Sequence, residues 1–312
     1  GDIIHANINY NNMYTEGLNH GTAVAGVAAA QISNSNTVGV APGCKVYPVK
    51  LEVNTSGDLL VSFSKLYSIA LFLNDKVNVW NNSWGYSNAG TTLPTVITTL
   101  IDSMVGKDGK GVTTVWSAGN QGVPIHKAST DAPVNIDIPY SVDTSVSPPT
   151  YESSTSFDRM AYSLTNGIIV GACSSLNTRS KYSNYGDGLS VVAPSSNSDP
   201  WDSVTAVGSY IVCSDGGNRV ANDFGGTSGA APIVAGIAAL VKSANPNLTA
   251  IEIKDIIEQS ADKDLDPTDY DKIADWDISP IYTADFDDNG WSPWFGYGKV
   301  NAYKAVKLAK GI

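Results

Sequence analysis

The sequence predicts an α/β protein with a three-layer, doubly wound and mostly parallel sheet that carries helices on both faces. Three observations support this prediction. Apolar runs of strand length alternate with helical runs along most of the chain. Several helical runs are rich in Ala and Gly and nearly free of charge, as expected for helices buried against a sheet. The chain of 312 residues is long enough to bury a substantial core as one domain.

The individual elements follow from local patterns. Residues 59–74 show apolar spacing close to the helical period of about 3.6 residues, and Thr249 with Glu252 makes the pattern of a helix capping box. The expected helices cover residues 18–31, 59–74, 95–105, a run that starts at Ser228, 249–261 and a last helix from Asn301. The expected strands cover residues 45–51, 77–81, 112–116, 168–172, 189–193 and 209–213.

Two stretches interrupt this alternation. Residues 122–166 are rich in Pro, Ser, Thr and Asp with little periodicity. We expect an insertion there that is mainly a solvated surface excursion, although its start could wall a pocket. Residues 262–290 carry many acidic side chains. We expect the whole chain, residues 1–312, to form a single domain.

The chain is organised around residues 225–240, where small residues precede a run of Ala, Ile, Val and Leu. This run predicts a helix buried on nearly all sides, with Pro232 in its first turn. Ser228 then stands at the positive end of the helix. It can cap the helix, or it can attack a carbonyl while its own N–H holds the oxyanion. A Gly-x-Ser-x-Gly nucleophile elbow is excluded, because Ala230 stands where the second glycine is needed.

His20 and Asn120 are the polar side chains whose sequence settings suit work with a serine nucleophile. His20 opens another Gly- and Ala-rich helical run, and histidine is the usual general base because its pKa lies near working pH. Asn120 stands in a glycine turn after an apolar strand, and its amide is a neutral donor for an oxyanion. The alternatives are an ordinary core or surface histidine and an ordinary turn asparagine.

These three segments, in the order His, Asn, Ser, resemble the subtilisin-like serine proteases (subtilases, peptidase family S8), with details closer to kexin-like and bacterial members. Further matching landmarks lie at residues 38–46, 79–85, 182–186, 192–194 and 296–302. The resemblance implies that Ser228 is the nucleophile, His20 the general base and Asn120 an oxyanion donor. It also implies that two segments bind an extended substrate through Ser83, Trp84, Gly85, Ser117 and Gly119.

Two departures from the family pattern stand out. Gly229 follows the nucleophile where the family usually has Met, which changes the packing under the site. The resemblance also implies a catalytic Asp at the end of a first core strand, some tens of residues before His20. The one Asp ahead of His20 is Asp2, with no turn glycine after it. We therefore expect the first core strand and its Asp to lie outside this sequence, either removed from a fragment or on a separate N-terminal chain or prodomain. The alternative is a domain in which the Asp is absent. Without that Asp, turnover would fall about 10⁴-fold.

A structural calcium site is the one cofactor candidate. Asp285, Asp287 and Asn289, followed by Gly290, copy the first half of a calcium loop. The twelfth position is Gly296 rather than the Glu that would close such a loop, so an acidic solvated turn is the alternative. No cofactor is expected in catalysis.

The overall charge and composition restrict the partners. A net charge of −11 argues against nucleic acid and anionic membranes, and no run is expected to span a bilayer. A secreted, periplasmic or cell-surface protein fits this composition. The cysteines at 44, 173 and 213 have no metal-binding spacing, and they form either three thiols or one disulfide with a leftover thiol.

The sequence therefore predicts a serine endopeptidase acting on polypeptides through an acyl-enzyme. Residues 87–90 contain no acid, so a strict dibasic preference is not expected. The alternatives are a catalytically silent binding or regulatory protein of the same fold and an esterase that uses the same residues. Without the Asp, the chain alone would be inactive or nearly so.

Overall fold

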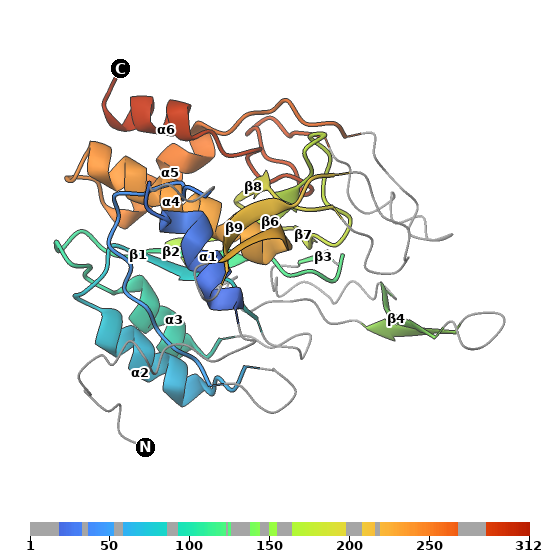
Figure 1. Ribbon diagram of the computed structural model, residues 1–312, viewed down its shortest axis with the longest axis horizontal. Helices are drawn as coiled ribbons and strands as arrows, with labels where there is room; N and C mark the ends of the chain where they lie inside the picture. The colour runs from blue at the N-terminus through green and yellow to red at the C-terminus, as the bar shows by residue number, and fades with distance from the viewer. Residues whose placement is uncertain are drawn as a thin grey trace.

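The computed structural model describes residues 19–32, 37–52, 59–85, 93–122, 124–125, 138–143, 150–154, 164–197, 208–215, 219–267 and 285–312. Its centre is a four-stranded sheet with the order β1-β2-β6-β8 (Figure 1). The strands are β1 (Val79–Asn82), β2 (Thr113–Ser117), β6 (Gly167–Cys173) and β8 (Val191–Pro194). All three pairings are parallel, which confirms the predicted class.

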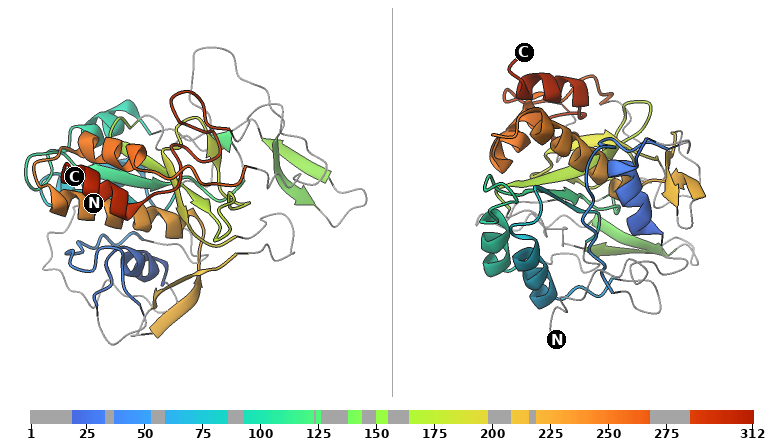
Figure 2. Two further views of the ribbon diagram at one scale, coloured as in Figure 1. Left: turned by 90° about the horizontal axis from the view of Figure 1, so that it is seen from above. Right: turned by 60° about the vertical axis from the view of Figure 1, so that its left-hand side comes forward.

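Helices cover both faces of this sheet (Figures 1 and 2). One face is covered by α4 (Thr227–Ala244), α5 (Ala250–Gln259) and α6 (Ala302–Ala309), and the other by α2 (Phe63–Leu73) and α3 (Thr95–Asp102). A further helix, α1 (His20–Ala29), packs against α4. The molecule thus has the predicted three layers.

The alternation of side chains along β6 shows how the sequence specifies two cores. Ile168 and Val170 face α4 and α5, whereas Ile169 and Cys173 face the side covered by α2 and α3. Every residue of this strand is buried, as expected for a strand of a parallel sheet with helices on both sides.

Helix α4 passes through the middle of the protein. By length and composition it is the one described helix that could cross a membrane, a test that the buried core helix of a globular domain also passes. Its apolar window is 61% buried inside the fold, as in the core helix of a globular domain. Pro232 lies inside α4, beyond the first turn in which it was expected.

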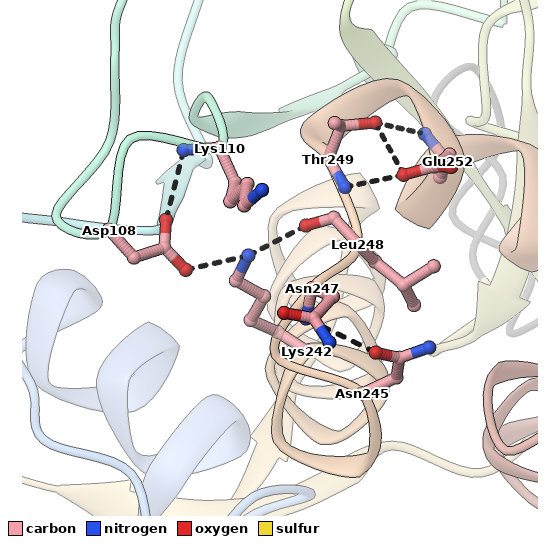
Figure 3. A network of polar contacts seen from close by, with 8 residues as sticks. All are labelled: Asp108, Lys110, Lys242, Asn245, Asn247, Leu248, Thr249 and Glu252. Carbon is pink, nitrogen blue, oxygen red and sulfur yellow. Dashed lines mark hydrogen bonds and ion pairs between the residues drawn. The ribbon is translucent and has the colours of Figure 1, made fainter.

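Lys242, near the carboxyl end of α4, bonds to residues of two loops (Figure 3). Lys242 Nζ lies 2.7 Å from Asp108 Oδ2 and donates to the Leu248 carbonyl at 2.7 Å. Asp108 also accepts a hydrogen bond from Lys110 N at 3.2 Å. The next helix, α5, begins with the predicted capping box between Thr249 and Glu252.

Two expected strands differ from the prediction. Residues 45–51 form no strand, because no described strand lies beside them to complete a hydrogen-bonded ladder. Residues 209–213 contribute to β9 (Ile211–Asp215), but β9 pairs antiparallel with β10 (Arg219–Phe224) in a separate two-stranded sheet. β10 was not predicted, because its polar sequence lacks an apolar strand run.

The expected insertion contains some regular structure. Within residues 122–166, β4 (Ile138–Asp143) pairs antiparallel with β5 (Thr150–Ser154). At the start of the same stretch, β3 (Pro124–Ile125) pairs parallel with β7 (Tyr185–Gly186), which lies later in the chain. β4 lies well outside the sheet and its helices (Figure 1). All three cysteines are free, with Cys173 and Cys213 buried and Cys44 half-buried.

Candidate active site

Ser228 is the second residue of α4 and lies at the amino-terminal end of that helix. The chain reaches it from β10 through Gly225 and Gly226. Gly226 has a φ of 72°, which side chains rarely adopt, and a Cβ there would lie 3.2 Å from Asn120 Nδ2. The turn therefore needs glycine both for its backbone and for the close approach of Asn120. It leaves Ser228 half-buried at the positive end of a buried helix.

Asn120 reaches this helix end from the loop after β2. Its Oδ1 accepts hydrogen bonds from the backbone N and from Oγ1 of Thr227, each at 2.8 Å. The backbone N of Gly119 donates to Thr227 Oγ1 at 3.2 Å. Because Oδ1 takes both bonds from Thr227, the amide has Nδ2 to offer as a donor to a ligand at Ser228.

The loop after β1 also meets Ser228. Ser83 Oγ donates to the Ser228 carbonyl at 3.0 Å, and Ser228 Oγ donates to the Ser83 carbonyl at 3.4 Å. Asn82 and Trp116 are partners in the β1–β2 register, so the segments Ser83-Trp84-Gly85 and Ser117 to Gly119 leave the sheet side by side. The expected substrate-binding segments are therefore neighbours at the same edge of the sheet.

His20 is the first residue of α1, and its ring meets Phe224 edge-on with the centroids 5.6 Å apart. Phe224 ends β10, four residues before Ser228. Among the described residues, the imidazole and the Ser228 hydroxyl share no hydrogen bond, since the hydroxyl points to Ser83. His20 keeps access to solvent, yet desolvation by the atoms packed around its ring lowers its pKa.

The early acid that the sequence offers, Asp2, lies outside the described residues. Asp2 belongs to the undescribed segment 1–18. In the part of the chain that the structure describes, desolvation alone accounts for the shifted pKa of His20, with no neighbouring carboxylate to raise it.

The space beside Gly229 is filled by other side chains. A Cβ at this position would lie 2.7 Å from Ile211 Cδ1, 3.2 Å from Ser195 Oγ and 3.6 Å from Phe224 Cδ1. A methionine at this position would need that volume. The glycine thus allows Ile211 and Phe224 to pack next to the residue that follows Ser228.

The expected calcium residues form a turn that satisfies itself. Asp287 Oδ1 accepts hydrogen bonds from Asn289 N at 2.9 Å and Trp291 N at 2.8 Å. The ammonium group of Lys263 contacts the carbonyl oxygens of Gly290 and Tyr297. In the described part of the chain no three His, Cys, Asp or Glu side chains gather as metal ligands. The ammonium group of Lys263 already bonds to the carbonyl oxygens that a cation would use in this turn. As they are placed, Asp285, Asp287 and Asn289 therefore do not fit a calcium ion.

Several residues of the site were not singled out from the sequence. Ser195 Oγ donates to the Gly226 carbonyl at 2.8 Å, and Ser196 Oγ accepts from Gly226 N at 3.2 Å. Buried Asn184 donates through Nδ2 to the Ala118 carbonyl at 2.9 Å, beside Asn120. The one signal for Asn184 is its position in the landmark at residues 182–186, and no sequence pattern marks the two serines.

Comparisons with known proteins agree on one family. The family model described as "Subtilase family" matches residues 4–298. A calcium-dependent protease of Trichormus variabilis is 32% identical over 317 residues, covering 93% of this chain and 40% of that protein. Protease KEX1 of Kluyveromyces lactis is 28% identical over 299 residues, covering 93% of this chain and 32% of that protein. The chain thus spans less than half the length of these relatives.

A solved structure shows the same fold. A protease from Pseudoalteromonas arctica superimposes with a TM-score of 0.59 at 22% identity, covering 93% of this chain and 70% of that chain. At this identity the likeness concerns the fold. The three-layer arrangement around the β1-β2-β6-β8 sheet is therefore shared with a solved protease.

Proposed function

The chain belongs to the subtilase family, and on that premise we propose that it is a serine endopeptidase with Ser228 as its nucleophile. The observation that carries the proposal is the meeting of Asn120 and Ser83 with the first turn of α4, which also presents Ser228. An amide donor, a hydroxyl and a helix amino terminus together suit a reaction that develops an oxyanion.

In the proposed mechanism, Ser228 Oγ turns from Ser83 toward His20 and attacks the peptide carbonyl carbon. His20 accepts the hydroxyl proton. The oxyanion that forms receives hydrogen bonds from Asn120 Nδ2 and from Ser228 N. His20 then protonates the leaving amine, and water hydrolyses the acyl-enzyme by the reverse steps. Thr227 contributes by holding Asn120 Oδ1, which directs Nδ2 toward the reacting carbonyl.

We also propose that the orienting carboxylate comes from a strand outside this chain, so that the 312 residues are one catalytic domain without its first core strand. The open sheet supports this. Among the described strands β1 pairs with β2 alone, which leaves its other edge available. The segment 45–51 belongs to no described strand, and its Val46 is 53% exposed. An additional parallel strand beside β1 would end at the same rim as Ser83.

The proposed substrate is an extended polypeptide. It would lie along Ser83-Trp84-Gly85 on one side and Ser117 to Gly119 on the other, pairing with their backbone as an added strand does. The names of the protease relatives support a protein substrate, and action outside the cell or in the periplasm fits the acidic composition. A relative named a calcium-dependent protease is a reason to test calcium at sites other than the turn at 285–289.

The test is proteolysis by the protein expressed with its natural flanking sequence. We expect cleavage of unfolded casein, and a loss of about 10⁴-fold or more in kcat/KM for Ser228→Ala and for His20→Ala. Ser260→Ala, in a buried helix end away from the site, serves as the matched control and should keep full activity. Cleavage that persists in Ser228→Ala would refute the proposed nucleophile.

Two other functions give different results in the same experiment. A catalytically silent subtilase would cleave neither casein nor an activated ester. An esterase would hydrolyse a nitrophenyl ester through Ser228 but leave casein intact. The exposure of Asn120 and its bonding through Oδ1 favour the enzyme, since they leave Nδ2 available as a donor for an oxyanion at Ser228.

A further inference from the structure

Pro232 changes the hydrogen bonding of the residue that carries the nucleophile. In an α-helix each backbone N–H donates to the carbonyl four residues earlier, so position 232 would serve the Ser228 carbonyl. Proline has no N–H and cannot make this bond. Pro232 lies inside α4 and is buried. The Ser228 carbonyl is therefore without its usual i+4 donor.

Ser83 supplies a donor from another element. Its Oγ donates to the Ser228 carbonyl at 3.0 Å, across 145 positions of sequence. Ser83 is 6% exposed and Ser228 is half-buried, so the bond between them is partly shielded from water. A carbonyl that is shielded from water and has no partner is destabilising, and this hydroxyl supplies the partner.

Asn81 fixes the direction of the Ser83 hydroxyl. Asn81 Nδ2 donates to Ser83 Oγ at 2.9 Å. A serine hydroxyl has one proton, and because its oxygen accepts from Asn81, that proton is directed to the Ser228 carbonyl. The result is a one-way chain from Asn81 through Ser83 to Ser228.

Ser83 also meets the nucleophile itself. Its carbonyl accepts from Ser228 Oγ at 3.4 Å, so Ser83 touches Ser228 at both the backbone and the side chain. Both contacts join the carboxyl end of β1 to the first turn of α4. Sheet and helix are rigid elements, and joining them here limits how far Ser228 can shift relative to the substrate-binding segment that begins at Ser83.

We propose that the Ser83 hydroxyl is a positioning group for the nucleophile. Asn81 orients this hydroxyl, and Pro232 leaves the Ser228 carbonyl without a helical donor, so that the carbonyl can accept the hydrogen bond from Ser83. This inference rests on the proposed endopeptidase function and adds residues to its site. Ser83 does not exchange protons with the substrate. It acts through Ser228, by holding the backbone from which Oγ must reach both His20 and the peptide carbonyl. A displacement of about 1 Å in such a geometry can cost about 100-fold in rate.

The first test compares Ser83→Ala, Ser83→Thr and the control Ser260→Ala in casein and peptide hydrolysis. Ser260 Oγ also donates to a backbone carbonyl, that of Ile257 at 3.3 Å, so its loss matches the chemistry away from the site. We expect kcat of Ser83→Ala to fall tenfold or more with KM nearly unchanged, because the substrate-binding backbone stays, as estimated from about 1 Å of displacement. Ser83→Thr keeps the hydroxyl and should restore most of kcat. Equal kcat in Ser83→Ala and wild type would overturn the proposal.

The second test uses Pro232→Ala, which supplies the missing N–H. If the Ser228 carbonyl gains this helical donor, the additional loss from Ser83→Ala in the Pro232→Ala background should be at least threefold smaller than in wild type, since coupled residues are not additive. Equal losses in the two backgrounds would contradict the chain from Ser83 to Ser228. A merely destabilising serine replacement would give such equal losses.

A third measurement does not need activity. Hydrogen exchange of residues 225–231 should be faster in Ser83→Ala than in wild type or Ser260→Ala, because the first turn of α4 loses its tie to β1. Faster exchange in a protein that cleaves nothing would refute the proposed function while supporting the positioning role. Unchanged exchange together with unchanged kcat would refute the positioning role alone.

Discussion

The ring of His20 rests edge-on against Phe224, and this contact affects the pH at which the imidazole is a base. Desolvation disfavours the charged imidazolium, so the pKa of His20 lies below its usual range. An ordered carboxylate beside the ring would act in the opposite direction. The protonation of His20 therefore reports whether burial or an acid dominates around it.

For the 312-residue chain, NMR titration should give His20 a pKa below about 6.5, and Phe224→Ala should raise it by admitting water to the ring. Because the folded pKa is lowered, the unfolded chain binds the proton more tightly, and stability falls as pH drops through and below about 6.5. His20→Gln identifies the resonance among the three histidines. A pKa above the usual value would show that an acid, and not burial, controls the ring.

Gly229 offers a second test at the residue scale. Met at this position should collide with Ile211 Cδ1, since even a Cβ would lie 2.7 Å from it. Overpacking of this kind costs about 1–3 kcal/mol, so Gly229→Met should lower the melting temperature and disturb Phe224. Adding Ile211→Ala should recover most of the loss, and calorimetry of the single and double variants measures it. If the losses in stability from Gly229→Met and Ile211→Ala simply add in the double variant, Ile211 does not occupy the space that a methionine would need.

The contacts that build the site explain what the sequence could show of it. His20, Asn120 and Ser228 stand out because glycine or small residues surround each one. The roles of Thr227 and Ser83 depend on contacts across 107 and 145 positions, which no local pattern records. Pro232 was recognised as a helix residue, but its effect on the Ser228 carbonyl appears only when Ser83 is seen to donate there.

At the scale of elements, helices were predicted better than strands. A capping box or an apolar stripe belongs to one helix, as Thr249 with Glu252 illustrates. A strand needs a partner, and residues 45–51 have strand composition without one among the described residues. β10 has the reverse property: its sequence is polar, yet it forms a strand because β9 pairs with it.

The ion pair between Lys242 and Asp108 at the carboxyl end of α4 gives a prediction about the stability of the fold (Figure 3). Partial burial acts to raise the pKa of Asp108, but hydrogen bonds from Lys242 and Lys110 N and the charge of Lys242 outweigh it and leave the pKa lowered. Lys242→Met keeps the apolar stem and removes the charge. It should cost about 1 kcal/mol and about 2 °C in melting temperature, while exposed Lys310→Met should cost nothing.

The same pair should respond to acid in a defined direction. Asp108 has a folded pKa below its unfolded value, so its contribution is complete above about pH 4 and is lost as pH falls through the folded value. The difference in melting temperature between wild type and Lys242→Met should therefore shrink below about pH 4. Casein hydrolysis should be unaffected at neutral pH, because this tie lies at the opposite end of α4 from Ser228. If the difference in melting temperature between wild type and Lys242→Met persists in acid, the loss of stability comes from packing and not from the charge of Lys242.

For the molecule as a whole, the edge of β1 that no described strand pairs with links stability to activity. If natural sequence upstream of residue 1 supplies a strand with an acid, the longer protein should label faster with an active-site reagent than the 312-residue chain, by up to about 10⁴-fold. It should also melt at a higher temperature, because the edge of β1 is then paired. Equal rates in the two proteins would show that the triad acid does not come from that sequence.

The central claim is that folding brings the base at 20, the donor at 120 and the hydroxyl at 228 to one reacting centre. The most direct test is reaction of the protein, with its natural flanking sequence, with a fluorophosphonate, followed by mass spectrometry of the modified peptide. We expect one adduct on Ser228, none in Ser228→Ala, and labelling slowed at least 100-fold in His20→Ala. An adduct on another residue, or labelling indifferent to His20, would contradict it.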